Sequence, residues 1–260
     1  MHVTVADDAT PRVVGADRVL AVFKELAAHP NGASLDELTR MMGSPKPTVH
    51  RALAALCRAG LADRHATGRY VLGDEFLRMA FAAHEARPEQ VRLRPVLEGL
   101  AERFGETAHY AVLHGSEIVY RAKVDPPTGA VRLTSTIGGR NPAHTTAAGK
   151  LLLAHRHRTR AELAEWVGDR DLQRRTANSR CTVDALHREL ARVRTCGYAT
   201  DDQENEIGVN CLALPVYLTS PAMPSGAVSI SALTYRTPLS RLVDAVEEIR
   251  SRLASQGLSA

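Results

Sequence analysis

Apolar residues near the N-terminus recur at the spacing of a helix, with polar residues between them. Residues 1–13 are polar and irregular, which is typical of a frayed tail. In the following stretch, "ADRVLAVFKELAAH", positions i, i+3, i+4 and i+7 are apolar: Val19, Val22, Phe23 and Leu26. This spacing predicts an amphipathic helix, which the turn residues "PNG" end.

Two further short helices are predicted before residue 60. In "SLDELTRMMG", Ser34 has Glu37 three residues later, which is a capping box for the helix start, and Gly43 ends that helix. Ser44 is suited to cap the third helix, and Pro45 to be its first residue, where a missing N–H costs nothing.

The third helix should run from about Pro45 to Ala59, with Gly60 as a left-handed C-terminal cap. At about 100° per residue, its inner face is apolar and comprises Val49, Ala52, Leu53 and Leu56. Its outer face is small and basic and comprises Pro47, Arg51, Ala54 and Arg58. Three such helices predict a helix-turn-helix, whose last helix fits a DNA major groove.

The segment "LADRHATGRYVLG" predicts a hairpin of two strands, Leu61–Arg64 and Arg69–Leu72, which would form a wing. The arginines that flank its tip are suited to phosphate or minor-groove contacts. The predicted DNA-contacting residues are Lys46, Pro47, Thr48, His50, Arg51, Arg58, Arg64 and Arg69. A basic surface helix without a DNA partner is the alternative, and it fits a lone helix better than this ordered set.

The C-terminal two thirds mixes helical and strand periodicities. The segments that predict strands are "TAHYAVLHG", "SEIVYRAKV", "GAVRLTSTI", "VNCLALPVYL" and "GAVSISALTY". Helices are predicted around Pro95, which should start or kink the first of them, in three central segments, and after Thr237, which should cap the last. Strands come first, helices in the middle, and strands with a helix last, which predicts an α+β sheet domain.

Composition and charge narrow the class of protein. The chain has 260 residues, which favours two domains. It has no apolar run of the roughly 18 residues that a membrane helix needs, and its start does not have the pattern of a signal peptide, so a cytoplasmic protein is expected. Four cysteines without a CxxC pair predict reduced thiols and no structural zinc. The net charge of +4 is by itself weak support for a nucleic-acid partner.

Polar groups of the second domain predict a ligand pocket. In "GAVSISALTY", the period of two sends Ser229 and Ser231 to one face, and the preceding strand places Val209 and Cys211 together. Two hydroxyls on an interior strand need partners, which a polar ligand would supply. The loop "GGRNPAHTTAAGK" enters a helix whose first amides are suited to bind a carboxylate. The alternative to a ligand site is purely structural. The serines would then be hydrogen-bonded within the protein, and the acids of "DDQENEIG" would form a solvated loop.

The stretch "SLDELTRMMGSPKPTVHRALAALCRAGLADRHATGRYVLG" resembles the winged helix-turn-helix of the IclR family of bacterial transcriptional regulators. The segments "RNPAHTTAAGK" and "GYATDDQENEIGVNCLALPV" resemble the signature of that family's effector domain. The resemblance implies a tail over 1–13, a DNA-binding domain over 14–73, a linker helix over 74–87 and a GAF-like effector domain over 88–260. One departure is Pro47, where the family commonly has Ser or Thr.

The resemblance also implies the site residues and partners. The effector pocket would be lined by Leu133, Ala147, Ala148, Asp201, Val209, Cys211, Ser229 and Ser231. Its ligand would be a small organic acid, held by helix N-terminal amides and the serine hydroxyls, with no metal or other cofactor. Subunits would pair through their DNA-binding regions, as homodimers or tetramers, on a pseudo-palindromic operator. A ligand-responsive regulator is thus expected, with repression favoured over activation.

Two other functions compete with this one. The first is a cysteine-dependent GAF-like enzyme that carries a DNA-binding domain, with Cys211 as nucleophile, a histidine such as His144 and an acid such as Asp201. That chemistry requires the base within hydrogen-bond reach of the thiol, which sequence does not place. The second is a constitutive DNA-binding protein whose other domain has no ligand. The expectation here is a regulator that is not an enzyme.

Overall fold

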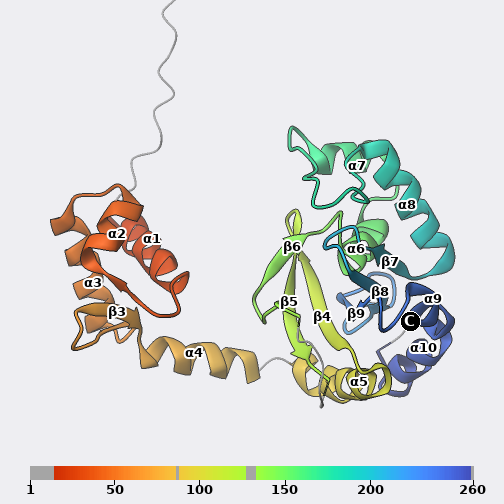
Figure 1. Ribbon diagram of the computed structural model, residues 1–260, viewed down its shortest axis with the longest axis horizontal. Coiled ribbons are helices and arrows are strands. Elements are labelled where there is room, and N and C mark those ends of the chain that lie inside the picture. The colour runs from red at the N-terminus through yellow and green to blue at the C-terminus, as the bar shows by residue number, and fades with distance from the viewer. Residues whose placement is uncertain (1–14, 86–87, 127–132, 259–260) are drawn as a thin grey trace, which may run out of the picture. The chain divides into compact units, whose positions relative to one another are not determined.

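The computed structural model describes residues 15–85, 88–126 and 133–258. The chain forms two compact units, residues 1–87 and residues 88–260, and each unit has a hydrophobic core of its own. Figure 1 labels the helices and strands of both units. The strand predicted in "GAVRLTSTI" lies partly outside the described residues. The two ends of the chain, residues 1–14 and 259–260, lie wholly outside them.

The described part of the first unit combines helices with a small antiparallel sheet of strand order β1-β3-β2. Its elements are α1 Gly15–Ala27, β1 Ala33–Ser34, α2 Leu35–Met42, α3 Lys46–Arg58, β2 Ala62–Arg64, β3 Arg69–Leu72 and α4 Asp74–Glu85. The helix-turn-helix and its wing are confirmed. The pairing of β1 with β3 was not predicted, because a two-residue strand has no periodicity of its own.

The local signals at the start of α2 act as predicted. The Ser34 side chain accepts a hydrogen bond from the Glu37 N–H, and the Glu37 carboxylate accepts one from the Ser34 N–H at 2.7 Å. Gly43 ends the helix in the left-handed conformation, with φ of 56°. The start of α3 differs by one residue from the prediction: Pro45 is the N-cap, because its backbone is extended, and the Ser44 hydroxyl donates to the Met42 carbonyl.

The second unit is built on an antiparallel sheet of order β6-β5-β4-β9-β8-β7. Its strands are β4 Thr107–His114, β5 Glu117–Val124, β6 Arg140–Pro142, β7 Ala199–Asp202, β8 Val209–Val216 and β9 Gly226–Leu233. Its helices are α5 Pro88–Phe104, α6 Ala147–Arg156, α7 Arg160–Val167, α8 Val183–Cys196, α9 Leu239–Asp244 and α10 Val246–Ser255. The predicted α+β class is confirmed.

The two faces of this sheet have different tasks. Val228 and Ile230 of β9 pack into the core that α5, α9 and α10 cover, whereas Ala227 packs toward α6 and α8 on the other face. Figure 1 shows these helices on the two sides of the sheet. Because successive side chains of a strand alternate, Ser229 and Ser231 share the face opposite Val228 and Ile230, as predicted, and the structure shows that this face is the α6 side.

Two predictions for this unit were wrong in detail, and one of the two alternatives for Pro95 is excluded. Residues 133–137 form no strand, and residues 127–132 lie outside the described part of the chain. Helix α5 begins at Pro88, so Pro95 does not start it, and a kink at Pro95 stays a prediction. Thr237 does not cap the last helix: its hydroxyl donates to the buried Glu106 carboxylate at 2.9 Å, and Pro238 is the N-cap of α9 instead.

Candidate DNA-binding and effector sites

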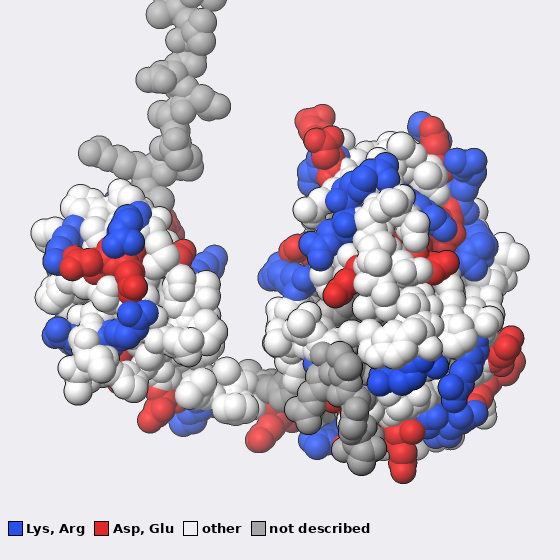
Figure 2. Space-filling model, in the orientation of Figure 1, with Lys and Arg blue, Asp and Glu red and all other residues white. Residues whose placement is uncertain are grey.

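The outer face of α3 is free in the first unit. Its inner residues Val49, Leu53 and Leu56 are buried in the core, as predicted. The outer side chains Lys46, Pro47, His50, Arg51 and Arg58 are exposed, and Thr48 is half-buried. On the face visible in Figure 2, basic and acidic side chains of this unit are interspersed, so the position on α3, more than the net charge, marks the candidate DNA surface.

Two predicted DNA contacts have partners within the chain. The Lys46 ammonium lies 2.6 Å from the Asp36 carboxylate, and both side chains are exposed, so a phosphate could replace that carboxylate at little cost. Arg69 is held more firmly, because its guanidinium donates to the Asn31 and Gly32 carbonyls and contacts Glu37. Its contacts tie the wing to the start of α2, a task that sequence reasoning missed.

Arg64, at the other end of the predicted wing, is exposed and lies over the ring of Tyr70, 5.7 Å from the ring centroid. Tyr70 is buried in the core, so the arginine rests on a fixed support. The two wing arginines are equivalent in the sequence pattern but differ in the structure. Arg64 projects from the surface, whereas the Arg69 guanidinium is bound to groups of the same unit.

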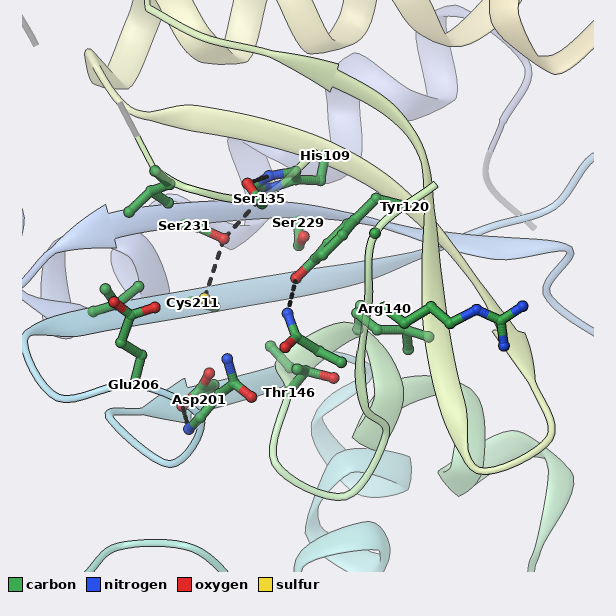
Figure 3. Close-up of a pocket in the computed structure, with 18 of the residues that line it drawn as sticks. His109, Tyr120, Ser135, Arg140, Thr146, Asp201, Glu206, Cys211, Ser229 and Ser231 are labelled. Atoms are coloured by element: carbon green, nitrogen blue, oxygen red, sulfur yellow. Dashed lines mark hydrogen bonds between the residues drawn. The ribbon is translucent and has the colours of Figure 1, made fainter. Parts of the chain in front are cut away.

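One pocket of the second unit, of about 290 Å³, brings together all eight residues predicted for the effector site. They are Leu133, Ala147, Ala148, Asp201, Val209, Cys211, Ser229 and Ser231. Figure 3 shows the serines and Cys211 along the sheet, and Asp201 lies on β7, where it pairs with Cys211 of β8. Thr146 lies at the start of α6. Strands β8 and β9 supply one wall, the start of α6 a second, and residues 133–141 a third.

Several polar lining residues were missed by sequence reasoning. These are His109, Tyr120, Ser135, Thr136, Arg140, Asn141, Thr146, Arg175, Asn205 and Glu206. Strands β4 and β5 were recognised, but nothing in their sequences tells which face meets a cavity, since both faces of a covered sheet are buried. The pairing of His109 with Ser229 across β4 and β9 places the histidine in this wall.

A chain of hydrogen bonds crosses the strand wall (Figure 3). The Cys211 thiol donates to the Ser231 hydroxyl at 3.2 Å, Ser231 meets His109 Nδ1 at 3.4 Å, and His109 Nε2 meets the Ser135 hydroxyl at 2.8 Å. On a neighbouring part of the wall, the Asn141 amide donates to the Tyr120 hydroxyl at 3.2 Å.

The start of α6 supplies backbone N–H groups to the pocket. The Thr146 side chain is the N-cap and accepts from the Gly149 N–H at 3.2 Å. Among the described contacts, the N–H groups of Ala147 and Ala148 have no hydrogen-bond partner. Gly149 allows the loop before the helix to approach closely, because a Cβ there would lie 2.2 Å from the Ala143 carbonyl oxygen. The result is a site suited to an anionic group.

Burial sets the protonation of the pocket. It lowers the pKa of His109 to about 3, so the imidazole is neutral at neutral pH. It raises the pKa of Asp201 to about 7, against the opposing effect of Lys150 and two backbone N–H groups. Burial also raises the pKa of the Cys211 thiol, as does the charge of Asp201. A thiol in this state is a poor nucleophile.

Behind Asp201 lies a buried ion network. Lys150 of α6 is fully buried; its ammonium contacts the Glu204 carboxylate and lies 3.5 Å from that of Glu189. Burial opposes ionisation of Glu189, but Arg192, Lys150 and Arg180 hold its pKa at about 2. Two of the acids that read as a solvated run, Asp201 and Glu204, are thus buried.

His144, the histidine named for the catalytic alternative, has a partner other than Cys211. The His144 Nε2 contacts the Gln173 carbonyl at 3.0 Å, and this histidine lines a separate hollow beside Trp166. The thiol of Cys211 meets Ser231 instead. Across residues 15–85, 88–126 and 133–258, no cluster of three His, Cys, Asp or Glu side chains could hold a metal ion. In the same residues, no helix is long and apolar enough to cross a membrane.

Comparisons with known proteins cover both units. Residues 15–66 match the model of the IclR helix-turn-helix domain, and residues 90–257 match that of the C-terminal domain of the bacterial transcriptional regulator IclR. The DNA-binding transcriptional repressor YiaJ of Escherichia coli is 32% identical over 84% of this chain and 78% of its own length. The glycerol operon regulatory protein of Streptomyces coelicolor is 30% identical over 85% of each chain.

Solved structures agree on the fold. A putative transcriptional regulator from Rhodococcus sp. RHA1 is similar with a TM-score of 0.79 and 27% identity, over 93% of this chain and 95% of that one. An IclR homologue from Microbacterium hydrocarbonoxydans, complexed with 4-hydroxybenzoate, has a TM-score of 0.76 at 22% identity, over 92% and 98%. From both matched domains and the identity to these regulators, the chain belongs to the IclR family of bacterial transcriptional regulators.

Proposed function

We propose that this protein is a ligand-responsive transcriptional repressor whose effector is a small organic acid bound in the α6 pocket. One observation carries the proposal: eight residues, chosen from four separate stretches of sequence, line a single cavity beside two N–H groups that have no described partner. The relative YiaJ is named a repressor, and the Microbacterium homologue holds an organic acid, 4-hydroxybenzoate. A chromosome-binding regulator works in the cytoplasm.

The proposed assembly is a homodimer, or a pair of dimers, on a pseudo-palindromic operator. Helix α4 supports pairing through the first unit, because its apolar side chains Leu77, Met79 and Phe81 are exposed, Phe81 by 63%. Exposed apolar side chains grouped on one helix are typical of an interface. Two recognition helices would then reach successive major grooves.

The proposed domain limits are 14–73, 74–87 and 88–260, with the DNA surface formed by Lys46, Pro47, Thr48, His50, Arg51, Arg58 and Arg64. No catalytic role is proposed, since burial raises the pKa of the Cys211 thiol, and that thiol donates to the Ser231 hydroxyl. The experiment is a gel shift on DNA upstream of the gene and its neighbours, with and without a panel of small organic acids. A shift that no acid alters would favour a constitutive DNA-binding protein.

Replacing Arg51 by alanine is expected to remove most of the preference for the operator over random DNA, by about tenfold or more, because Arg51 lies on the exposed face of α3 nearest the base edges. Arg64→Ala should instead weaken binding to all sequences alike and reduce the salt slope by about one. Fluorescence anisotropy on both DNAs at several salt concentrations separates the two. Arg94→Ala, on the second unit, is the control. Equal losses on both DNAs for Arg51→Ala would contradict its assignment.

Replacing both Ser229 and Ser231 by alanine is expected to abolish the effector response and leave operator binding intact. The two hydroxyls lie on the pocket wall, and removing them also breaks the hydrogen bonds of Cys211 and His109 to Ser231. Gel shifts with the effector measure the response. Ser251→Ala, on an exposed face of α10, should behave as the wild type. An unchanged response in the double variant would place the effector elsewhere.

A further inference from the structure

The strand wall of the pocket consists of neutral groups that both donate and accept hydrogen bonds. We infer that the effector is a hydroxylated aliphatic acid whose hydroxyls meet this wall, while its carboxylate meets the start of α6. The inference rests on the proposed function, and it names the chemical class of the ligand within that same pocket. It distinguishes such an acid from three competitors: an unsubstituted fatty acid, a dicarboxylic acid and an aromatic acid.

The hydrogen-bond chain through His109 leaves one serine proton unused. A neutral imidazole has one N–H and one acceptor nitrogen, so one of its serine partners, Ser231 or Ser135, must donate to it while the other accepts. The Cys211 thiol also donates to Ser231, whose oxygen can accept two hydrogen bonds. The serine that accepts from His109 keeps its own hydroxyl proton, which is left for the pocket.

The position of Ser135 is fixed from outside the pocket. The Lys123 ammonium donates to the Leu133 and Ser135 carbonyls, at 2.9 and 2.8 Å, and also pairs with Asp125 at 3.1 Å. This lysine therefore holds the loop of residues 133–135 against β5, and its charge is already matched by a carboxylate. The loop presents a hydroxyl, with no cation, to the ligand.

Two further hydroxyls extend the same surface. The Tyr120 oxygen already accepts from Asn141, so its own proton is left to donate. The Ser229 hydroxyl has no described hydrogen-bond partner although its residue is only 4% exposed. Figure 3 shows Ser135, Ser229 and Tyr120 around the same space. Buried hydroxyls need partners, and ligand oxygens at several positions would supply them.

The charges of the pocket argue against a second carboxylate at this wall. His109 is neutral, Lys123 is paired with Asp125, and Asp201 and Glu206 line the neighbouring part of the cavity. The two arginines of the lining are engaged elsewhere: Arg140 pairs with Glu117 and points away from this wall in Figure 3, and Arg175 donates to the Asn205 carbonyl. An ionised group without a counter-charge is costly to bury, whereas a hydroxyl matches neutral donors and acceptors. A cavity of about 290 Å³ also suits a small ligand.

The test is calorimetric titration of the full chain with acids matched in carbon number. The four-carbon set is threonate, butyrate and succinate; the six-carbon set is gluconate, hexanoate and adipate; 4-hydroxybenzoate represents aromatic acids. In one of the two sets or in both, the hydroxylated acid should bind about tenfold more tightly than the two other acids of its set and than 4-hydroxybenzoate. The reason is that a site that forms hydrogen bonds to ligand hydroxyls rejects analogues without them. If in neither set the hydroxylated acid binds best, the inference is overturned.

The Ser135→Ala variant tests the wall itself. It should weaken binding of the preferred hydroxylated acid by about tenfold, since one hydrogen bond between neutral groups is lost. Binding of the unsubstituted acid of the same carbon number should not change. Tyr120→Phe serves the same purpose if Ser135→Ala does not fold, which the fluorescence of Trp166 reports. An equal loss for both acids would overturn the assignment of the wall.

Failure of this inference and failure of the proposed function give different results. If an aromatic or unsubstituted acid releases the operator, the regulator stands and the ligand class is wrong. If gluconate or threonate binds tightly but never changes operator binding, the wall is correct and the regulatory function is wrong.

Discussion

The Lys150→Met variant should destabilise the second unit by about 3–5 kcal/mol, because removal of one partner from a buried ion network leaves the others uncompensated. Lys150 is fully buried on α6 and contacts the carboxylates of Glu204 and Glu189, which are 3% and 7% exposed. The measurement is urea unfolding followed by the fluorescence of Trp166, the one tryptophan of the chain, which lies on α7 of this unit.

The loss should depend on pH. Burial already raises the pKa of Glu204 and brings that of Asp201 to about 7, and without the nearby ammonium both should rise further. A carboxyl whose pKa is raised in the folded state favours folding while it is protonated and opposes it once ionised. Lys150→Met should therefore be closest to the wild type near pH 5 and most destabilised above pH 7.

The matched control is Arg160→Met. Its guanidinium lies 2.6 Å from Asp184, but both side chains are more than half exposed, so its loss should leave the unfolding midpoint nearly unchanged. If Lys150→Met were as mild as this control at every pH, the buried network would contribute nothing to stability, and the argument from burial would be wrong.

Gly149→Ala should destabilise the second unit by about 3 kcal/mol and abolish effector binding, because overpacking against backbone atoms cannot be relieved by turning a side chain. A Cβ at Gly149 would lie 2.2 Å from the Ala143 carbonyl oxygen and 2.4 Å from its Cα. Relief requires α6 to move away from the loop, which displaces the N–H groups of Ala147 and Ala148 that face the pocket.

The same unfolding curve and a titration with the effector test this prediction. Gly15→Ala is the control, because a Cβ there meets nothing within 4 Å and its helix α1 belongs to the first unit. A Gly149→Ala variant that binds effector normally would mean that α6 and its loop adjust without moving the N–H groups.

The local pattern determined the elements that carry their own signals. The apolar stripe of α3, the capping box of Ser34 and Glu37, and the alternation that separates Val228 from Ser229 are all read from neighbouring residues. They hold in the structure because helix and strand periodicities act over a few residues. The predicted helix boundary was wrong where a residue distant in the sequence is involved. At the start of α9, the Thr237 hydroxyl donates to the Glu106 carboxylate and does not cap the helix.

The pocket shows the limit of such reasoning. The resemblance to a family indicated eight lining residues, but it did not indicate His109, Tyr120 or Ser135. It also did not decide whether the acids of "DDQENEIG" face solvent or line the pocket. Lys150 likewise reads as an ordinary helix residue until α6 packs against α8 and the loop after β7. The sequence around each of these residues does not indicate which groups will surround its side chain in the folded protein.

The sequence alone thus determined the third helix of the helix-turn-helix and the strand face that carries the serines, since each depends on periodicity within one element, and its length indicated two domains. Only the tertiary structure decided which charges are buried, which arginine of the wing remains exposed without internal hydrogen bonds, and which hydroxyls share one wall. Those outcomes depend on contacts between segments far apart in the chain, such as Ser231 and His109, 122 positions apart, and on the loss of water that such contacts impose.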